Sequence, residues 1–177
     1  MAAALLANIH GRMDEARRLA QQAHDLSVQI GDSFIRAYAS TQLARACLKL
    51  GDIMAARHSA VEALLAARRI PNVAAMGYAL ELWATAELRD GRAERAGQLY
   101  ALAERGYRQA GYQLWRTDAE EHRQFDTELR AALGDRYEEV LAQSQTIDLD
   151  RAIDELVESD PAAQALRHRI SLVAADR

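Results

Sequence analysis

Cysteine and proline are nearly absent from this chain. Its 177 residues include one cysteine, Cys47, and two prolines, whereas alanine and leucine are abundant and β-branched residues are sparse. A single cysteine excludes an internal disulfide and any metal site built from several cysteines. Few helix breakers and many strong helix formers favour helix nearly everywhere. We therefore predict an all-α fold, in which Cys47 is most simply a small buried side chain.

Clustered positive charge is also missing. The formal net charge is -4, and basic residues occur only as scattered pairs. Proteins that bind nucleic acid usually carry a basic face, so we expect no direct contact with nucleic acid. The apolar start of the chain, residues 1–9, lacks a basic leader and is too short to span a bilayer. We accordingly expect no membrane contact and a cytoplasmic location.

Residues that could carry chemistry form no known motif. None of the five histidines is paired with another at the i, i+4 spacing of a helical metal site. The chain has neither a Gly-rich phosphate loop nor a nucleophile elbow. Residues 118–126 place several carboxylates around His122, which is typical of a solvated helix face. We predict no catalytic residue, no cofactor and no metal.

An internal repeat organises most of the chain. Three glycines lie 40 residues apart, and the same small residues surround each: alanine seven positions before, and alanine five and twelve positions after. A glycine between two helices permits a tight turn, and alanine lets two helix axes approach closely. The pattern predicts helical hairpins that assemble into a right-handed solenoid. The expected helices span residues 2–9, 12–30, 33–50, 53–69, 72–89, 92–109 and 112–132.

The small-residue pattern resembles the signature of the tetratricopeptide repeat. The matching positions are Gly11, Ala16 and Ala23; Gly51, Ala56 and Ala63; and Gly91, Ala96 and Ala103. The period is longer than the family's usual value of about 34 residues, and most of its aromatic positions are replaced. Longer repeats of this kind are found in large bacterial signalling regulators.

The stretch after the third repeat differs in character. It has a turn at Gly134, a short helix that begins with an aromatic residue, a polar break and a new helix. It resembles the end of the helical C-terminal region in actinobacterial LuxR-type regulators of the STAND ATPase class and in related adenylyl-cyclase-linked regulators. The matches are Leu129, Arg130, Leu133, Gly134, Tyr137, Leu149, Asp150 and Ala152, whereas Gln145 departs from the pattern.

The repeat predicts the domain organisation, and the resemblance adds a role. We expect repeats over residues 1–134, with turns at Gly11, Gly51, Gly91 and Gly134, and capping helices over residues 135–177. Asn72, Asp148 and Asp160 are the expected N-caps. The chain would be a fragment or a relative of such a regulator, with a scaffold or sensor role and a regulatory ATPase module as a possible partner. Neither ATP hydrolysis nor DNA binding is implied, because the corresponding motifs are missing.

In tetratricopeptide arrays, the helix before each turn glycine contributes one face to a concave wall. Counting back from the glycines predicts a binding face of Tyr38, Thr41, Arg45, Tyr78, Glu81, Thr85 and Arg89. Tyrosine and arginine are common interface anchors, and we expect the arginines to await a partner's carboxylates, whereas Arg17 and Arg57 lie on the opposite, convex side.

The face predicts a non-catalytic module that binds a protein, a peptide or a small effector. In a narrower alternative, the two tyrosines only pack between repeats. A second alternative is a structural module that self-associates as a homodimer through the exposed face of its first repeat.

Overall fold

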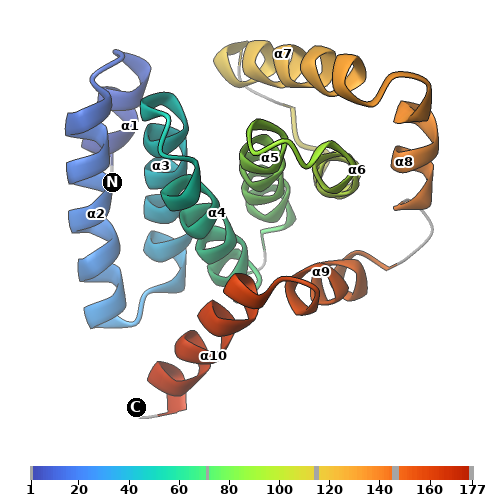
Figure 1. The fold of residues 1–177 in the computed structure, drawn as a ribbon. Helices are drawn as coiled ribbons and strands as arrows, with labels where there is room; N and C mark the ends of the chain where they lie inside the picture. Colours follow the sequence, from blue (N-terminus) through green and yellow to red (C-terminus); the bar gives the residue numbers. More distant parts are fainter. Residues whose placement is uncertain (1, 71, 114–115, 145–147, 176–177) are drawn as a thin grey trace.

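The computed structural model describes residues 2–70, 72–113, 116–144 and 148–175 (Figure 1). These residues form helices joined by turns and contain no strand, so the all-α prediction is confirmed for them. Pro71, Trp115 and Gln145 lie outside the described residues. Within the described ranges, no helix is both long enough and apolar enough to cross a bilayer.

The first six helices follow the predicted repeat closely. They are α1 (Ala2–Ile9), α2 (Met13–Ile30), α3 (Ser33–Leu50), α4 (Ile53–Ala67), α5 (Val73–Arg89) and α6 (Ala93–Ala110). Each packs mainly against its neighbours in the chain. The glycines at 11, 51 and 91 have φ angles of 73°, 79° and 79°, in the left-handed region that favours glycine. The tight turns expected between helices therefore form where the repeat places them.

Local chemistry also explains where these helices begin. The side chains of Asp32, Asp52 and Asn72 accept hydrogen bonds from backbone amides three residues later, which satisfies donors that a helix start leaves unpaired. The expected cap at Asn72 is confirmed.

The small residues of the repeat lie where the helices meet. Ala16, Ala56 and Ala96 have no exposed surface, and the same is true of Ala20 and Ala60. Larger side chains fill the centre of the core around α4, α5 and α6. They include Leu64, Leu80, Trp83, Leu99 and Leu102.

The chain leaves the repeat pattern after α6. Helix α7 (Arg116–Leu133) begins four residues later than the predicted position 112 and packs only sparsely against α6. In Figure 1 it lies across the top of the α5–α6 pair. Its apolar side chains are few, and Phe125 and Leu129 are the buried ones among its described side chains.

The C-terminal helices fold back along the repeats. A single 3-10 turn (Gly134–Arg136) leads into α8 (Tyr137–Gln143), followed by α9 (Leu149–Glu158) and α10 (Pro161–Ala175). Helices α8 and α9 pack against α6, and α10 reaches back to α4 (Figure 1). The predicted caps are confirmed, because Asp148 and Asp160 accept hydrogen bonds from the backbone amides of the second and third residues of α9 and α10.

A candidate binding groove between α3, α5 and α7

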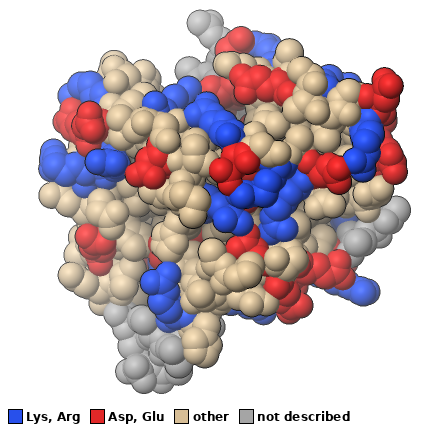
Figure 2. Space-filling model, viewed as in Figure 1, with Lys and Arg blue, Asp and Glu red and all other residues tan. Residues whose placement is uncertain are grey.

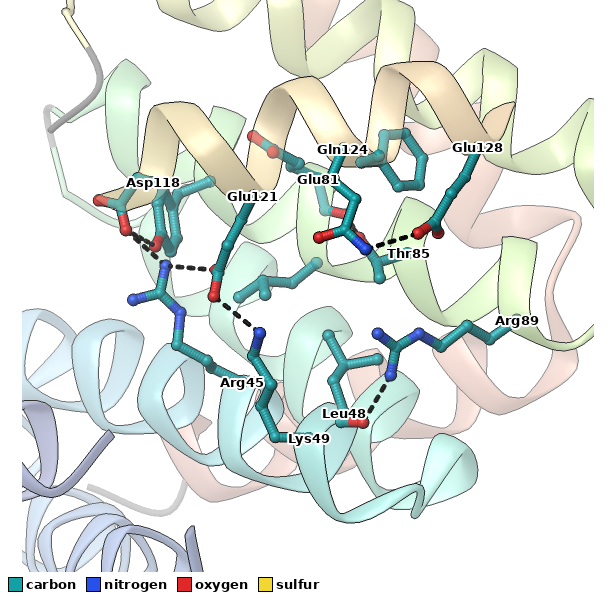
Figure 3. Close-up of a pocket in the computed structure, with 13 residues that line it drawn as sticks. Arg45, Leu48, Lys49, Glu81, Thr85, Arg89, Asp118, Glu121, Gln124 and Glu128 are labelled. Atoms are coloured by element: carbon teal, nitrogen blue, oxygen red, sulfur yellow. Dashed lines mark hydrogen bonds and ion pairs between the residues drawn. The ribbon is translucent and has the colours of Figure 1, made fainter. Parts of the chain in front are cut away.

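Five of the seven predicted binding residues line one small pocket. Helix α3 contributes Arg45, α5 contributes the other four, and α7 closes the pocket from above (Figure 3). The volume of this pocket is about 110 Å³. The five are Arg45, Tyr78, Glu81, Thr85 and Arg89.

The remaining two predicted residues do not reach this pocket. Thr41 is only 8% exposed, and its hydroxyl donates to the carbonyl of Ala37 within its own helix, at 2.8 Å. Tyr38 is half-buried, with its ring centroid 4.8 Å from that of Phe34 and its hydroxyl 3.5 Å from the amide nitrogen of Asn72. For Tyr38 the alternative of packing within the fold therefore describes its surroundings better.

Arg45 was expected to be available to a partner's carboxylates, and this expectation is wrong. Its guanidinium lies 2.6 Å from the carboxylate of Asp118 and 3.3 Å from that of Glu121, both on α7. It also lies over the ring of Tyr78, 5.2 Å from the centroid. The Tyr78 hydroxyl donates to Asp118 at 3.0 Å, and Lys49 pairs with Glu121 at 2.9 Å. Helix α7 thus supplies the carboxylates that were expected from a partner.

Arg89 is engaged as well. Its guanidinium donates to the backbone carbonyl of Leu48 at 2.6 Å, in the last turn of α3 (Figure 3). Carbonyls at a helix C-terminus lack partners within the helix and carry partial negative charge, so a cation there is stabilising. Arg89 therefore links the ends of α3 and α5.

Burial affects the two α7 carboxylates differently. It raises the pKa of Asp118, and the nearby Arg45 offsets this only in part. Burial also acts to raise the pKa of Glu121, but the hydrogen bond from Lys49 and the charge of Arg45 outweigh it, so the pKa of Glu121 is lowered. The ionised form of Asp118 is therefore held less favourably than that of Glu121.

His122 does not lie on a solvated helix face, so that expectation is wrong. One ring nitrogen lies 3.0 Å from Glu81 on α5, and the other lies 3.1 Å from Glu104 and 3.0 Å from the hydroxyl of Tyr100 on α6. The hydrogen bonds to Glu104 and Glu81 raise the pKa of His122 to about 10. Because a protonated imidazole has no free lone pair, His122 is unsuited to act as a general base near neutral pH. It connects α7 to α5 and α6.

Sequence reasoning missed Asp118 on α7 and Lys49 at the end of α3. It offered Glu121 as one of three alternatives for the same face, with Trp115 and Phe125, without fixing the register of that helix. Asp118, Glu121 and Lys49 form the polar roof and wall of the pocket. Their signals in the sequence were the acidic run at the start of α7 and the only lysine of the chain. Neither signal reveals that the two segments face each other, because 69 residues separate Lys49 from Asp118.

Charge is mixed over the surface. On the face drawn in Figure 2, basic and acidic side chains alternate and neither sign forms a continuous field. Among the described residues, no group of three or more His, Cys, Asp or Glu side chains could hold a metal ion. Comparison of the chain with protein-family models, curated proteins and solved structures finds no match.

Proposed function

We propose that this chain is a non-catalytic binding module, a tetratricopeptide-like right-handed solenoid whose concave α3–α5 face recognises an acidic helical segment of a protein partner. The observation that carries the proposal is the contact with α7, in which Asp118 and Glu121 meet Arg45 and Lys49. The α3–α5 face is therefore suited to bind a helix that carries acidic side chains. The resemblance to LuxR-type regulators supports a scaffold or sensor role in the cytoplasm, with a regulatory ATPase module among the candidate partners.

The size of the pocket favours a peptide over a small effector. A volume of about 110 Å³ is below the several hundred Å³ of most small-molecule sites. A partner helix would instead take the place of α7, whose attachment is largely polar. Such an exchange exposes little apolar surface, since only Phe125 and Leu129 are buried among the described α7 side chains.

Weakening the contact of α7 should open the face to a competing helix. We expect a labelled peptide of residues 116–133 to bind the Asp118→Asn, Glu121→Gln double variant about tenfold more tightly than the parent chain. The reason is that the chain's own α7 occupies the site in the parent and reduces the fraction of molecules competent to bind. Fluorescence anisotropy measures both affinities.

Two further variants serve as controls for that experiment. Glu120→Gln removes a charge from the exposed side of α7, where Glu120 pairs with Arg123, and should leave peptide affinity as in the parent. Arg45→Glu combined with Lys49→Glu should abolish binding. Equal affinity for the parent and the Asn/Gln double variant would remove the proposal.

A second candidate function, self-association, is favoured by an exposed apolar patch. Helix α1 has eight residues and α2 has 18, so α1 cannot run beside the last part of α2. Near that end, Leu26, Ile30 and Phe34 are 53%, 57% and 47% exposed. Exposed apolar patches often mark contacts between proteins, and this one would join two copies of the chain.

Self-association through this patch predicts a change in mass. Leu26→Lys combined with Ile30→Lys should convert a dimer into a monomer, because two charges would have to be desolvated at the interface. Light scattering coupled to size-exclusion chromatography gives the mass. Met54→Lys, at an exposed position at the start of α4, should leave the mass unchanged. A parent chain that is already monomeric at high concentration excludes this alternative.

A further inference from the structure

The C-terminal helices occupy one groove between repeat helices, and the preceding groove is open. At the α9–α10 turn, Asp160 pairs with Arg57 of α4 and lies 3.3 Å from the guanidinium of Arg95 of α6. Arg95 also donates to the carbonyl of Leu156. The turn is thereby fixed across the groove between α4 and α6, in contacts that involve none of the α3–α5–α7 pocket.

The floor of this occupied groove is formed by α5. Glu87 has no exposed surface and lies 2.8 Å from Arg57, and the indole nitrogen of Trp83 donates to it at 2.7 Å. The guanidinium of Arg95 lies over the Trp83 ring, 5.2 Å from its centroid. The occupied groove therefore has four defining positions: Arg57 on α4, Arg95 on α6, and Trp83 and Glu87 on α5.

The 40-residue repeat maps all four positions onto a second groove. Subtracting one period gives Arg17 on α2, Ala55 on α4, and Leu43 and Cys47 on α3. All four line one open cavity of about 640 Å³ between α2 and α4. The same architecture is thus present twice, and the first copy is unfilled by the described residues.

The unfilled groove differs in its charge balance. In the occupied groove, the floor residue Glu87 pairs with Arg57. The corresponding floor residue of the unfilled groove is Cys47, whose thiol carries no charge at neutral pH and cannot pair with Arg17 in this way. The contact of Arg17 with Asp52 is long, at 3.8 Å, and its side chain is 48% exposed. At the other end of the groove, Glu62 is already paired with Arg36 and His24. Asp14, on the same helix as Arg17, also lines the groove. Neither Asp14 nor Glu62 stands at the floor position that Cys47 occupies.

We propose that the groove between α2 and α4 binds an amphipathic helical segment of another protein, with an apolar face over Leu43 on the floor of the groove and a helix-capping carboxylate against Arg17. The α9–α10 segment shows this chemistry within the chain. Its apolar side chains are buried against the repeats, and its Asp160 both caps a helix and accepts from an arginine. The site is distinct from the α3–α5 face and does not depend on the function proposed for that face.

The test uses a labelled peptide of residues 148–170 added to the full chain. Fluorescence anisotropy should show saturable binding. Arg17→Glu should weaken it about tenfold, because the carboxylate would meet a like charge. Ala55→Arg should tighten it about fivefold, because it restores the second arginine of the occupied groove. Arg69→Glu, at an exposed position in the turn after α4 that does not line the cavity, should have no effect.

The peptide itself provides a matched pair of controls. Asp160→Asn keeps the helix cap, since asparagine caps as well as aspartate, but removes the charge and should weaken binding. Asp154→Asn should leave binding unchanged, because its partner Arg68 corresponds, one period earlier, to Val28, whose side chain carries no charge. Failure of the peptide to bind overturns the proposal. The proposal is also overturned if the peptide binds with the same affinity to the parent, Arg17→Glu and Ala55→Arg chains. The peptide would then be exchanging with the chain's own α9–α10.

Discussion

Replacing Glu87 by glutamine is expected to lower the free energy of unfolding by about 3–5 kcal/mol. Glu87 is fully buried and pairs with Arg57 and Arg92, and Arg95 lies 3.9 Å away. Glutamine has the same shape and can still accept the bond from Trp83, so the packing is kept. The charge is lost, however, and among the described residues Asp160 is then the one buried carboxylate that remains beside the guanidinium groups of Arg57 and Arg95. The cost comes from two desolvated cations that share a single counter-ion.

Chemical denaturation followed by circular dichroism measures this loss as a lower midpoint. The matched control is Glu94→Gln, the same substitution on a glutamate that pairs with Arg136 at the surface, where both side chains are more than half exposed. Exposed pairs contribute at most about 1 kcal/mol. If the two variants unfold at the same midpoint, the buried network stabilises the fold no more than a surface pair does.

The position of Glu87 also shows what an internal repeat can and cannot predict. Four residues before each turn glycine stand Ala7, Cys47 and Glu87, and all three are buried. The periodicity predicts the burial, because it follows from local helix geometry. It does not predict the charge at position 87, which is balanced by arginines on α4 and α6. Arg57 was expected on the convex side, and the repeat likewise gives no sign of its pairing with Asp160, which is 103 residues away.

The helix boundaries were predictable because their causes are local. Turn glycines and capping side chains act within about four residues, and they fixed α1 to α6 to within a few positions. Helix α7 has no comparable start signal, and its first residue was misplaced. One wall of the candidate groove was predictable. The distances of Arg45, Tyr78 and Arg89 from the turn glycines place all three on one face. That α7 covers this face depends on contacts between distant segments, such as that of Arg45 with Asp118, which no local pattern encodes.

The contact of His122 with its two carboxylates should make the stability of the fold depend on alkaline pH. The pKa of His122 is raised to about 10, from an ordinary value of 6.5, chiefly by hydrogen bonds to Glu104 and Glu81. A group whose pKa is higher in the folded state stabilises that state fully below its unfolded pKa, and the stabilisation is lost as pH rises through the folded pKa. The window of loss therefore runs from about pH 6.5 to pH 10.

We expect the free energy of unfolding of the parent chain to fall by on the order of 3–4 kcal/mol between pH 7 and pH 10, because each unit of pKa difference corresponds to about 1.4 kcal/mol. His122→Gln should be less stable at pH 7 but show a much flatter profile over this range. Chemical denaturation at several pH values gives both profiles. His168→Gln, which changes an exposed histidine on α10, should keep the parent's slope. Parallel profiles for the parent and His122→Gln would mean that the imidazolium does not hold α7 against α5 and α6.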